Sequence, residues 1–447
     1  MVSGGESGGG WRRTRFLLRA LRSRNYRLFF AGQGVSMVGT WMQQVAMSWL
    51  VYRLTGSAWL LGVVGFTSQA PSFFFSPVAG VLADRWDRRR LLVATQSLAM
   101  LQAAVLAAVV LTKVVQVWQI VLLSLLLGIV NAFDIPVRQS FVVEMVDDRE
   151  DLGNAIALNS SMVNGARLIG PAIAGLLVSA VGEGICFVLN SASYLAVILA
   201  LAAMRLAPLQ PSRQRRRMHH ELFEGISYAV GFAPIRNILL LVALVSLVGM
   251  PYAVLLPVFA REVFHGGAHT YGFLMTATGV GALTSTLYLA TRKSVLGLGR
   301  LIPLATALFG AGVCVLALSG SLVLSLAGLG AAGFGVMAQV ASSNTILQTI
   351  VEEDKRGRVM SLFVMAFIGM NPFGCLAAGA LADTIGPRET ILVGGVACLA
   401  GAALFAHQLP ALREKVRPIY VRMGIIHEVA TGMETATELA LPPEERS

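Results

Sequence analysis

The sequence predicts an all-α polytopic membrane protein, with twelve transmembrane helices arranged as two pseudo-symmetric six-helix bundles. The 447 residues are 55% hydrophobic and only 13% charged, and their mean hydropathy of +0.70 is too high for an ordinary soluble domain. Twelve apolar runs are long enough to cross a bilayer. The basic residues gather in every second connection between these runs, as expected for loops on one side of a membrane.

The chain divides, in order, into a basic N-terminus, six spans, a linker, six further spans and a tail. Residues 1–26 form the N-terminus and residues 27–204 the first bundle. Residues 205–234 form the linker, 235–408 the second bundle and 409–447 the tail. The predicted spans are 27–52, 58–83, 91–112, 116–136, 155–180, 184–204, 235–260, 270–291, 300–319, 321–345, 358–384 and 387–408.

Lysine and arginine are distributed unevenly between the two sides of the predicted bundle. With the N-terminus assigned to the cytoplasm, 29 of the 35 Lys and Arg residues fall in the N-terminus, the inner loops or the tail. Only Arg53, Lys113, Arg261 and Arg388 fall on the other side. This asymmetry predicts that both termini and the linker are cytoplasmic. The net charge of +11 therefore needs no nucleic-acid partner.

The connection between the second and third spans is short and strongly charged. Asp84 lies among arginines, where it can pair with one of them or with the positive end of a helix, and Asp87 is suited to capping the third span. A solvated loop that only follows the positive-inside rule is the simpler interpretation. The connection contains Gly80, Asp84, Arg85, Asp87, Arg88 and Arg89.

A weak internal repeat supports the division into two halves of six spans. Glycines of the fifth span and its flanks coincide with glycines of the eleventh when the sequence is shifted by 204 residues. The coinciding pairs are Gly153 with Gly357, Gly170 with Gly374, Gly175 with Gly379, and Gly182 with Gly386.

The charged connection resembles the loop between the second and third helices of the major facilitator superfamily, although Asp87 stands where that family usually has a second glycine. Residues 131–139, 154–161 and 166–175 are similar to the branch that includes enterobactin exporters, also called transmembrane secretion effectors. The resemblance is dense over residues 25–204. It implies a transporter in a bacterial inner membrane that exports a small amphipathic molecule such as a siderophore, drug or metabolite.

The fifth span carries Gly170 and Pro171, which resemble a motif of the superfamily's antiporters. Small residues let a neighbouring helix pack closely, and a proline lets the chain bend. We therefore expect these two residues to act in gating, together with Gly80, Asp84, Arg85, Arg88 and Arg89. A tight helix pair without a role in transport is the alternative.

Proton antiport is the expected energy source, because the sequence has no nucleotide-binding Gly-x-x-x-x-Gly-Lys-Ser/Thr loop and the fifth span resembles an antiporter. Asp134, near the inner end of the fourth span, is the candidate proton carrier. Arg138 lies four residues further on and can pair with it, although Pro136 between them disturbs simple i,i+4 pairing.

Arg167 is the one ionisable side chain well inside a span, roughly 18 Å deep at about 1.5 Å per residue. It either holds an anionic or strongly hydrogen-bonding part of a substrate, or braces the bend at Gly170 and Pro171. A polar stripe on the first span should face a cavity or hydrogen-bond to a neighbouring helix. The stripe contains Ser36, Thr40, Gln43 and Gln44, and the predicted substrate site comprises Thr40, Gln44, Arg167, Asn190 and Asn371.

Other classes of function have little support in the sequence. All six histidines fall in loops, tails or span ends, and the four cysteines are scattered in apolar spans, so neither catalysis nor a metal site is predicted. We expect no cofactor. The expected partners are a small-molecule substrate, protons and the lipid bilayer, and the expected state is a monomer. An importer, or a sensor with the same fold that does not transport, remains the alternative.

Overall fold

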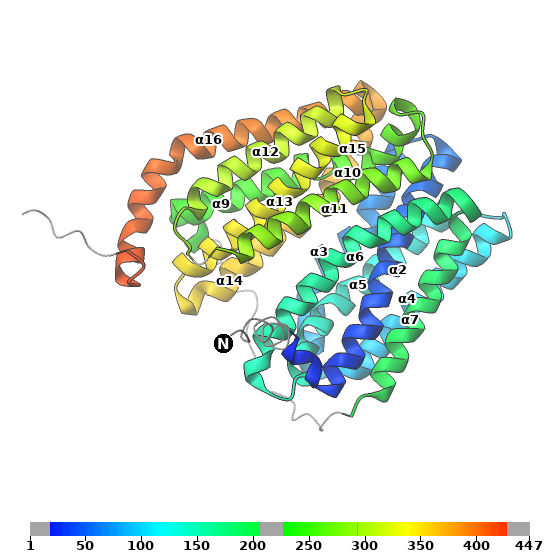
Figure 1. The fold of residues 1–447 in the computed structure, drawn as a ribbon, viewed down its shortest axis with the longest axis horizontal. Coiled ribbons are helices and arrows are strands. Elements are labelled where there is room, and N and C mark those ends of the chain that lie inside the picture. The colour runs from blue at the N-terminus through cyan, green and yellow to red at the C-terminus, as the bar shows by residue number, and fades with distance from the viewer. Residues whose placement is uncertain (1–17, 206–226, 293, 427–447) are drawn as a thin grey trace, which may run out of the picture.

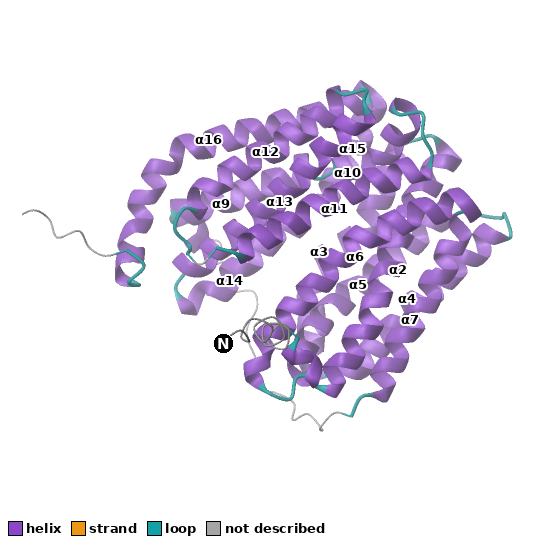
Figure 2. Cartoon of the chain, in the orientation of Figure 1, coloured by secondary structure: helices purple, strands orange, loops and turns teal. Residues whose placement is uncertain are grey.

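The computed structural model describes residues 18–205, 227–292 and 294–426, with residues 76–85 and 149 described by their backbone alone. Helices account for nearly all of the described chain (Figure 2). They form two bundles that meet along one side (Figure 1). The all-α prediction is confirmed.

The first bundle, here the N half, contains six long helices. A 3-10 turn, Arg19–Arg22, precedes them, and another, Arg149–Asp151, lies before the fifth. The six helices are α2 (Arg24–Thr55), α3 (Ala58–Arg85), α4 (Arg88–Leu111), α5 (Val117–Met145), α6 (Leu152–Val181) and α7 (Glu183–Ala203).

The second bundle, here the C half, also contains six long helical segments, two of which are interrupted by π-helical turns. The first is continuous over residues 233–263 and the fifth over 353–385. The elements are α9 (Ala233–Leu244), η3 (Val245–Gly249), α10 (Tyr252–Val258), η4 (Phe259–Val263), α11 (Ala268–Ala290), α12 (Leu298–Leu318), α13 (Leu322–Ile350), α14 (Glu353–Val364), η5 (Met365–Gly369), α15 (Asn371–Ile385) and α16 (Pro387–Arg422).

Each of the twelve predicted spans corresponds to one of these segments. Among the described residues, eleven segments are long and apolar enough to cross a membrane. The twelfth is α2, which has 32 residues but contains Gln33, Gln43 and Gln44, and these glutamines lower its hydropathy. The largest difference from the prediction is α16, which continues past residue 408 to Arg422 instead of ending with the span.

The two halves are joined at one end of the molecule, which we call the closed end; it carries the connections 56–57, 182, 264–267 and 386. One apolar core there includes Leu50 and Ala58 of the N half and Val258 and Tyr271 of the C half. The hydroxyl of Tyr52 on α2 also donates a hydrogen bond to Glu262 of the C half.

At the opposite end, the open end, the halves diverge toward the start of α14 (Figure 1). Each half has its own apolar core there, one around Tyr26 and Phe141 and the other around Ile302 and Phe363. A Cβ atom added at Gly357 would meet no atom within 4 Å. The described parts of the two halves therefore share no apolar core on the side where the sequence predicts the cytoplasm.

Two equivalent helix pairs make the connection between the halves, α6 with α11 and α3 with α15. In each pair glycines meet: Gly175 lies against Gly272, and Gly379 lies against Gly62, with an added Cβ about 3.0 Å from the partner's Cα in both cases. Gly175 and Gly379 are related by the shift of 204 residues seen in the sequence. The internal repeat is thus visible as two glycine contacts in equivalent places.

The same two pairs share a second feature close to the closed end. Ser179 on α6 accepts a hydrogen bond from the backbone N–H of His269, in the first turn of α11, at 3.1 Å. Asp383 on α15 accepts one from the backbone N–H of Trp59, in the first turn of α3, at 3.3 Å. Each half therefore caps the N-terminus of a helix of the other half.

Candidate functional site

Arg167 lies in the middle of α6, on the face where this helix meets the C half. A Cβ added at Gly279 on α11 would lie 3.2 Å from the backbone oxygen of Arg167. Tyr252 on α10, also in the C half, lies close to Arg167 and donates a hydrogen bond to Thr278 at 3.4 Å. Arg167 thus lies where α6 meets the C half.

The guanidinium of Arg167 is held by an aromatic ring and not by an acid. It lies 5.1 Å from the ring centroid of Trp41 on α2, within the range of a cation–π contact. Its Nε atom is buried and has no hydrogen-bond partner. In the described part of the chain, no carboxylate lies within ion-pair distance of it. A partly buried cation without a counter-charge attracts an anion.

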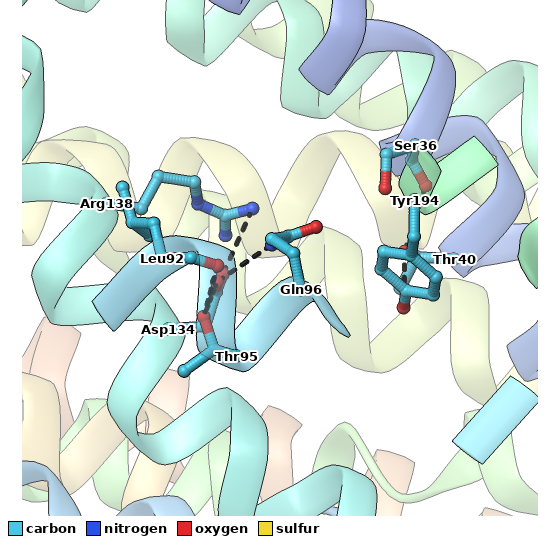
Figure 3. A network of polar contacts seen from close by, with 8 residues as sticks. All are labelled: Ser36, Thr40, Leu92, Thr95, Gln96, Asp134, Arg138 and Tyr194. Atoms are coloured by element: carbon cyan, nitrogen blue, oxygen red, sulfur yellow. Dashed lines mark hydrogen bonds and ion pairs between the residues drawn. The ribbon is translucent and has the colours of Figure 1, made fainter. Parts of the chain in front are cut away.

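The predicted polar stripe of α2 is split between two roles. Gln44 is exposed, one turn beyond Trp41 and Thr40 on the same helix face. Thr40 donates to the backbone oxygen of Ser36 at 2.9 Å and lies 3.4 Å from the hydroxyl of Tyr194 on α7 (Figure 3). Ser36 is buried, Thr40 binds within the N half, and the structure gives no direct contact of Thr40 or Gln44 with Arg167.

Gln43 and Asn190 form a hydrogen-bonded chain inside the N half. Asn190 on α7 donates to Gln43 at 2.8 Å, and Gln43 donates to Gln102 on α4 at 2.9 Å. Asn190 is fully buried, and its side-chain oxygen accepts from Ser193 at 3.1 Å. The structure therefore places Asn190 in helix packing, the alternative that the sequence left open for the stripe, and away from any surface that a substrate reaches.

Asn371 lies at the start of α15, and its amide donates to Gln69 on α3 at 2.8 Å. This bond joins the two halves, and the Oδ1 atom of Asn371 is buried without a partner. Asn371 belongs to the α3–α15 pair and Arg167 to the α6–α11 pair. The structure brings both residues to the boundary between the halves but gives no direct contact between them.

Asp134 on α5 is buried and bound by three side chains (Figure 3). One carboxylate oxygen accepts from Thr95 and from Gln96 on α4, each at 2.8 Å. The other oxygen lies 3.6 Å from Arg138, so the i,i+4 pair forms despite Pro136. Removing the charge of Asp134 would leave Arg138 without its ion-pair partner. The charge of Asp134 therefore affects how Arg138 is held on the same helix.

The charged residues between α3 and α4 that can be placed make their contacts within the N half. Asp87 caps α4, as expected, by accepting from the backbone N–H of Arg90 at 3.1 Å. Arg88 pairs with Glu144 on α5 at 2.5 Å, and Arg89 donates to the carbonyl of Ala202 on α7 at 2.8 Å. The side chains of the remaining predicted gating residues, Gly80, Asp84 and Arg85, lie outside the described residues.

Gly170 and Pro171 face different neighbours, one in each half. A Cβ at Gly170 would lie 2.5 Å from the Cβ of Trp41, so only glycine allows α2 to approach here and place Trp41 beside Arg167. A Cβ at Gly272 would lie 2.7 Å from the carbonyl oxygen of Pro171, next to the α6–α11 contact. The predicted close-packing face is confirmed. It lies between the Trp41–Arg167 contact and the α6–α11 contact.

Sequence reasoning missed the partners that define this site. Trp41 and Tyr252 belong to apolar runs and carry no motif, and Gln69 lies in a span with no other charged or amide residue before residue 84. The close glycine at 170 was the only signal that α2 approaches Arg167. Among the described residues, no group of three or more His, Cys, Asp and Glu side chains could hold a metal ion.

Comparison with known proteins agrees with this architecture. The sequence model of the family described as "Transmembrane secretion effector" matches residues 17–420. A staphyloferrin A transporter of Staphylococcus aureus is 27% identical over 383 residues, covering 85% of this chain and 95% of that protein. The multidrug efflux pump Tap of Mycolicibacterium fortuitum is 25% identical, covering 86% and 93%. The macrolide efflux protein A of Streptococcus pyogenes is 23% identical, covering 84% and 95%.

Solved structures share the fold at low sequence identity. A POT family transporter in complex with 5-aminolevulinic acid has a TM-score of 0.70 at 11% identity, covering 87% of this chain and 97% of that one. A bacterial homologue of the human lysosomal transporter Spinster, in an inward-facing and unoccupied conformation, has a TM-score of 0.64 at 14% identity, with the same coverage.

Proposed function

This chain belongs to the transmembrane secretion effector family of the major facilitator superfamily, and from that premise we propose that it exports a small anionic, amphipathic molecule by alternating access. It is a multi-pass membrane transporter and not an enzyme. The observation that carries the proposed substrate class is the cation of Arg167, which stands between the halves on the ring of Trp41 with no acid partner in the described chain.

Export is favoured over uptake by the named activities of two relatives, a multidrug and a macrolide efflux protein. We place both termini in the cytoplasm of a bacterial inner membrane, because the basic loops lie at the open end. The described conformation is then inward-open, which is the state that accepts a substrate for export. Ser160 and Ser161 are exposed near the open end of α6, and such polar side chains fit a face that meets water.

In this proposal the substrate binds beside Arg167, with its anionic group on the guanidinium and its apolar part against Trp41. Thr40 and Gln44 complete the N-half side of the site, and Tyr252 contributes from the C half. Asn371 acts at the same level through Gln69, across the second helix pair. Asn190 supports α2 from behind through Gln43. A ligand bound to both halves would favour rocking of one half against the other.

Export is tested by comparing metabolites between strains. An otherwise identical pair, with and without this protein, is analysed for small molecules in the medium and in the cells. We expect at least one anionic amphipathic compound to fall in the medium and rise in the cells when the protein is absent. The opposite change, depletion inside the cells without the protein, would identify an importer, and identical profiles under producing conditions would contradict transport of a cell metabolite.

We also propose that Asp134 carries the coupling proton. Its carboxylate is buried and bound by Thr95, Gln96 and Arg138, so gaining a proton would release Arg138 and loosen the helix pair α4–α5. Asp134→Asn, which mimics the protonated carboxyl, should abolish the acceleration of transport by a pH gradient in proteoliposomes while leaving exchange down a substrate gradient. Glu183→Gln, which breaks an ion pair with Arg53 elsewhere in the N half, is the control and should keep the coupling. A gradient response that survives in Asp134→Asn contradicts the assignment.

A further inference from the structure

A pocket lies at the open end of the C half, away from the boundary between the halves. It has a volume of about 500 Å³ and is formed by the start of α9, the start of α12 and the last turns of α16. This volume falls within the range of about 300–1,000 Å³ that is common for ligand pockets. All of its lining residues belong to the C half, so it is separate from the site at Arg167.

The pocket exists because α16 continues beyond the predicted span. Asn237 on α9 hydrogen-bonds to Gln408 and fixes the two helices side by side, and α16 then runs on to Arg422 (Figure 1). The added turns place Leu412 and Val416 over the start of α12, and both are buried. Phe405, Ile238 and Ile302 complete an apolar floor.

Three arginines surround this apolar floor. Arg413 and Arg417 project from α16, and Arg300 lies in the first turn of α12. The positive charge of Arg300 acts on Arg413, so the two cations repel each other. Glu414 is the one acid of the lining, and none of the three arginines has an ion pair with a described residue. Arg300 is also unfavourable beside the positive end of its own helix.

An apolar floor under a cationic rim, at the level where the inner membrane surface is expected, has the chemistry of a lipid site. We propose that this pocket binds an anionic phospholipid of the inner leaflet, with its phosphate among Arg300, Arg413 and Arg417 and an acyl chain on the apolar floor. The anion offsets the mutual repulsion of the arginines and is favoured by the positive end of the α12 dipole. The proposal is independent of what the protein transports.

The test is native mass spectrometry of the purified full chain, delipidated in detergent and titrated with phosphatidylglycerol or phosphatidylcholine. We expect one phosphatidylglycerol to bind with marked preference over phosphatidylcholine. Arg413→Gln/Arg417→Gln should weaken this binding by about fivefold for each arginine removed. Lys415→Gln is the matched control, because Lys415 lies between them on α16 but does not line the pocket, and it should leave binding unchanged.

A second variant fills the pocket without changing its charge. Gly299 lines it, and a Cβ added there would lie 3.7 Å from Leu409, so Gly299→Leu would be accommodated and would extend into the cavity. It should weaken phosphatidylglycerol binding while thermal unfolding of the lipid-free protein stays unchanged. The proposal is overturned if both the double variant and Gly299→Leu bind phosphatidylglycerol like wild type, or if glycerol phosphate without acyl chains displaces the lipid at equal concentration.

Discussion

The side chain with the largest consequence at the scale of single residues is Arg167. A charge placed this deep in a membrane protein normally has a partner, because an isolated guanidinium costs at least about 2.5–3.5 kcal/mol at the centre of a bilayer. Here Trp41 supplies a cation–π contact, which recovers only part of that cost. An anionic ligand can offset the remaining cost.

Replacing Arg167 separates a role in binding from a role in stability. Arg167→Gln should weaken binding of the exported anion roughly 10- to 150-fold, the equivalent of a charged hydrogen bond worth about 1.5–3 kcal/mol. Arg167→Lys keeps the charge but loses the planar fork, and should lie in between. The thermal unfolding temperature in detergent should not fall in Arg167→Gln, because the substitution removes an unpartnered charge.

The competing interpretation, in which Arg167 only braces the bend at Gly170 and Pro171, predicts the reverse pattern. Arg167→Gln would then unfold at a lower temperature and bind substrate as well as wild type does. Isothermal titration of the compound identified in the export experiment, together with differential scanning fluorimetry, distinguishes the two interpretations in one set of purified variants.

At the scale of helices, the most informative elements are the two glycine contacts between the halves. Gly272→Ala would place a Cβ 2.7 Å from the carbonyl of Pro171 and 2.9 Å from the Cα of Gly175. Overpacking of this kind costs about 1–3 kcal/mol. We expect α6 and α11 to separate. The ratio of outward-open to inward-open molecules should rise roughly 5- to 150-fold.

Spin labels at positions 114 and 320, in exposed loops of the N and C halves, report this separation as a longer distance. Gly165→Ala on α6 is the control, because an added Cβ there meets no atom within 4 Å. If Gly272→Ala and Gly165→Ala give the same distance distribution, the glycine contact does not hold the closed end together.

The helices themselves could be predicted from the sequence because each span is a long apolar run with charged or glycine-containing ends. The end of α16 could not, since beyond residue 408 the sequence turns polar, and only the packing of Leu412 and Val416 on α12 explains why the helix continues. The π-helical turns were also missed. In one of them the freed carbonyl of Phe367 accepts from Ser246 at 2.5 Å, a contact between distant helices that local patterns do not encode.

The candidate site was predicted in part, and the limits have a common cause. Arg167 was found because one charge in an apolar run is conspicuous, and Asp134 because it lies four residues from Arg138. The hydrogen bond of Asn190 to Gln43 could not be predicted, because helical spacing alone does not tell a cavity face from a face that packs on another helix. Which face α2 turns toward α7 is decided by Gly39, where an added Cβ would lie 2.5 Å from the Asn190 side chain.

At the scale of the whole molecule, the closed end is held by contacts that must break when the transporter opens outward. Asp383→Ala removes the cap on α3 and should raise the outward-open population about two- to fivefold, since a carboxylate at an exposed helix end contributes about 0.3–1 kcal/mol. The labels at 114 and 320 measure this change. Glu183→Gln is the control, because it breaks an ion pair with Arg53 inside the N half and should leave the distance between halves unchanged.

The opposite end is tested with the same approach. We expect Asp84 to meet the N-terminus of α14, near Arg356 and Arg358, when the open end closes. Asp84→Asn should then increase the inward-open population, the opposite sign to Asp383→Ala. Unchanged distances across the open end in Asp84→Asn would remove this latch.

The two caps between the halves differ in one respect that affects the whole molecule. Ser179 is neutral, whereas Asp383 is charged and exposed, although the two occupy equivalent positions. Ions in the outer solution screen the attraction between Asp383 and the end of α3 but have little effect on a hydroxyl. Rising ionic strength therefore weakens only the cap made by Asp383. At high ionic strength the closed end should therefore begin to open at the α3–α15 pair, while the α6–α11 pair stays in contact. A marine or saline medium would then favour the outward-open conformation more than a dilute medium does.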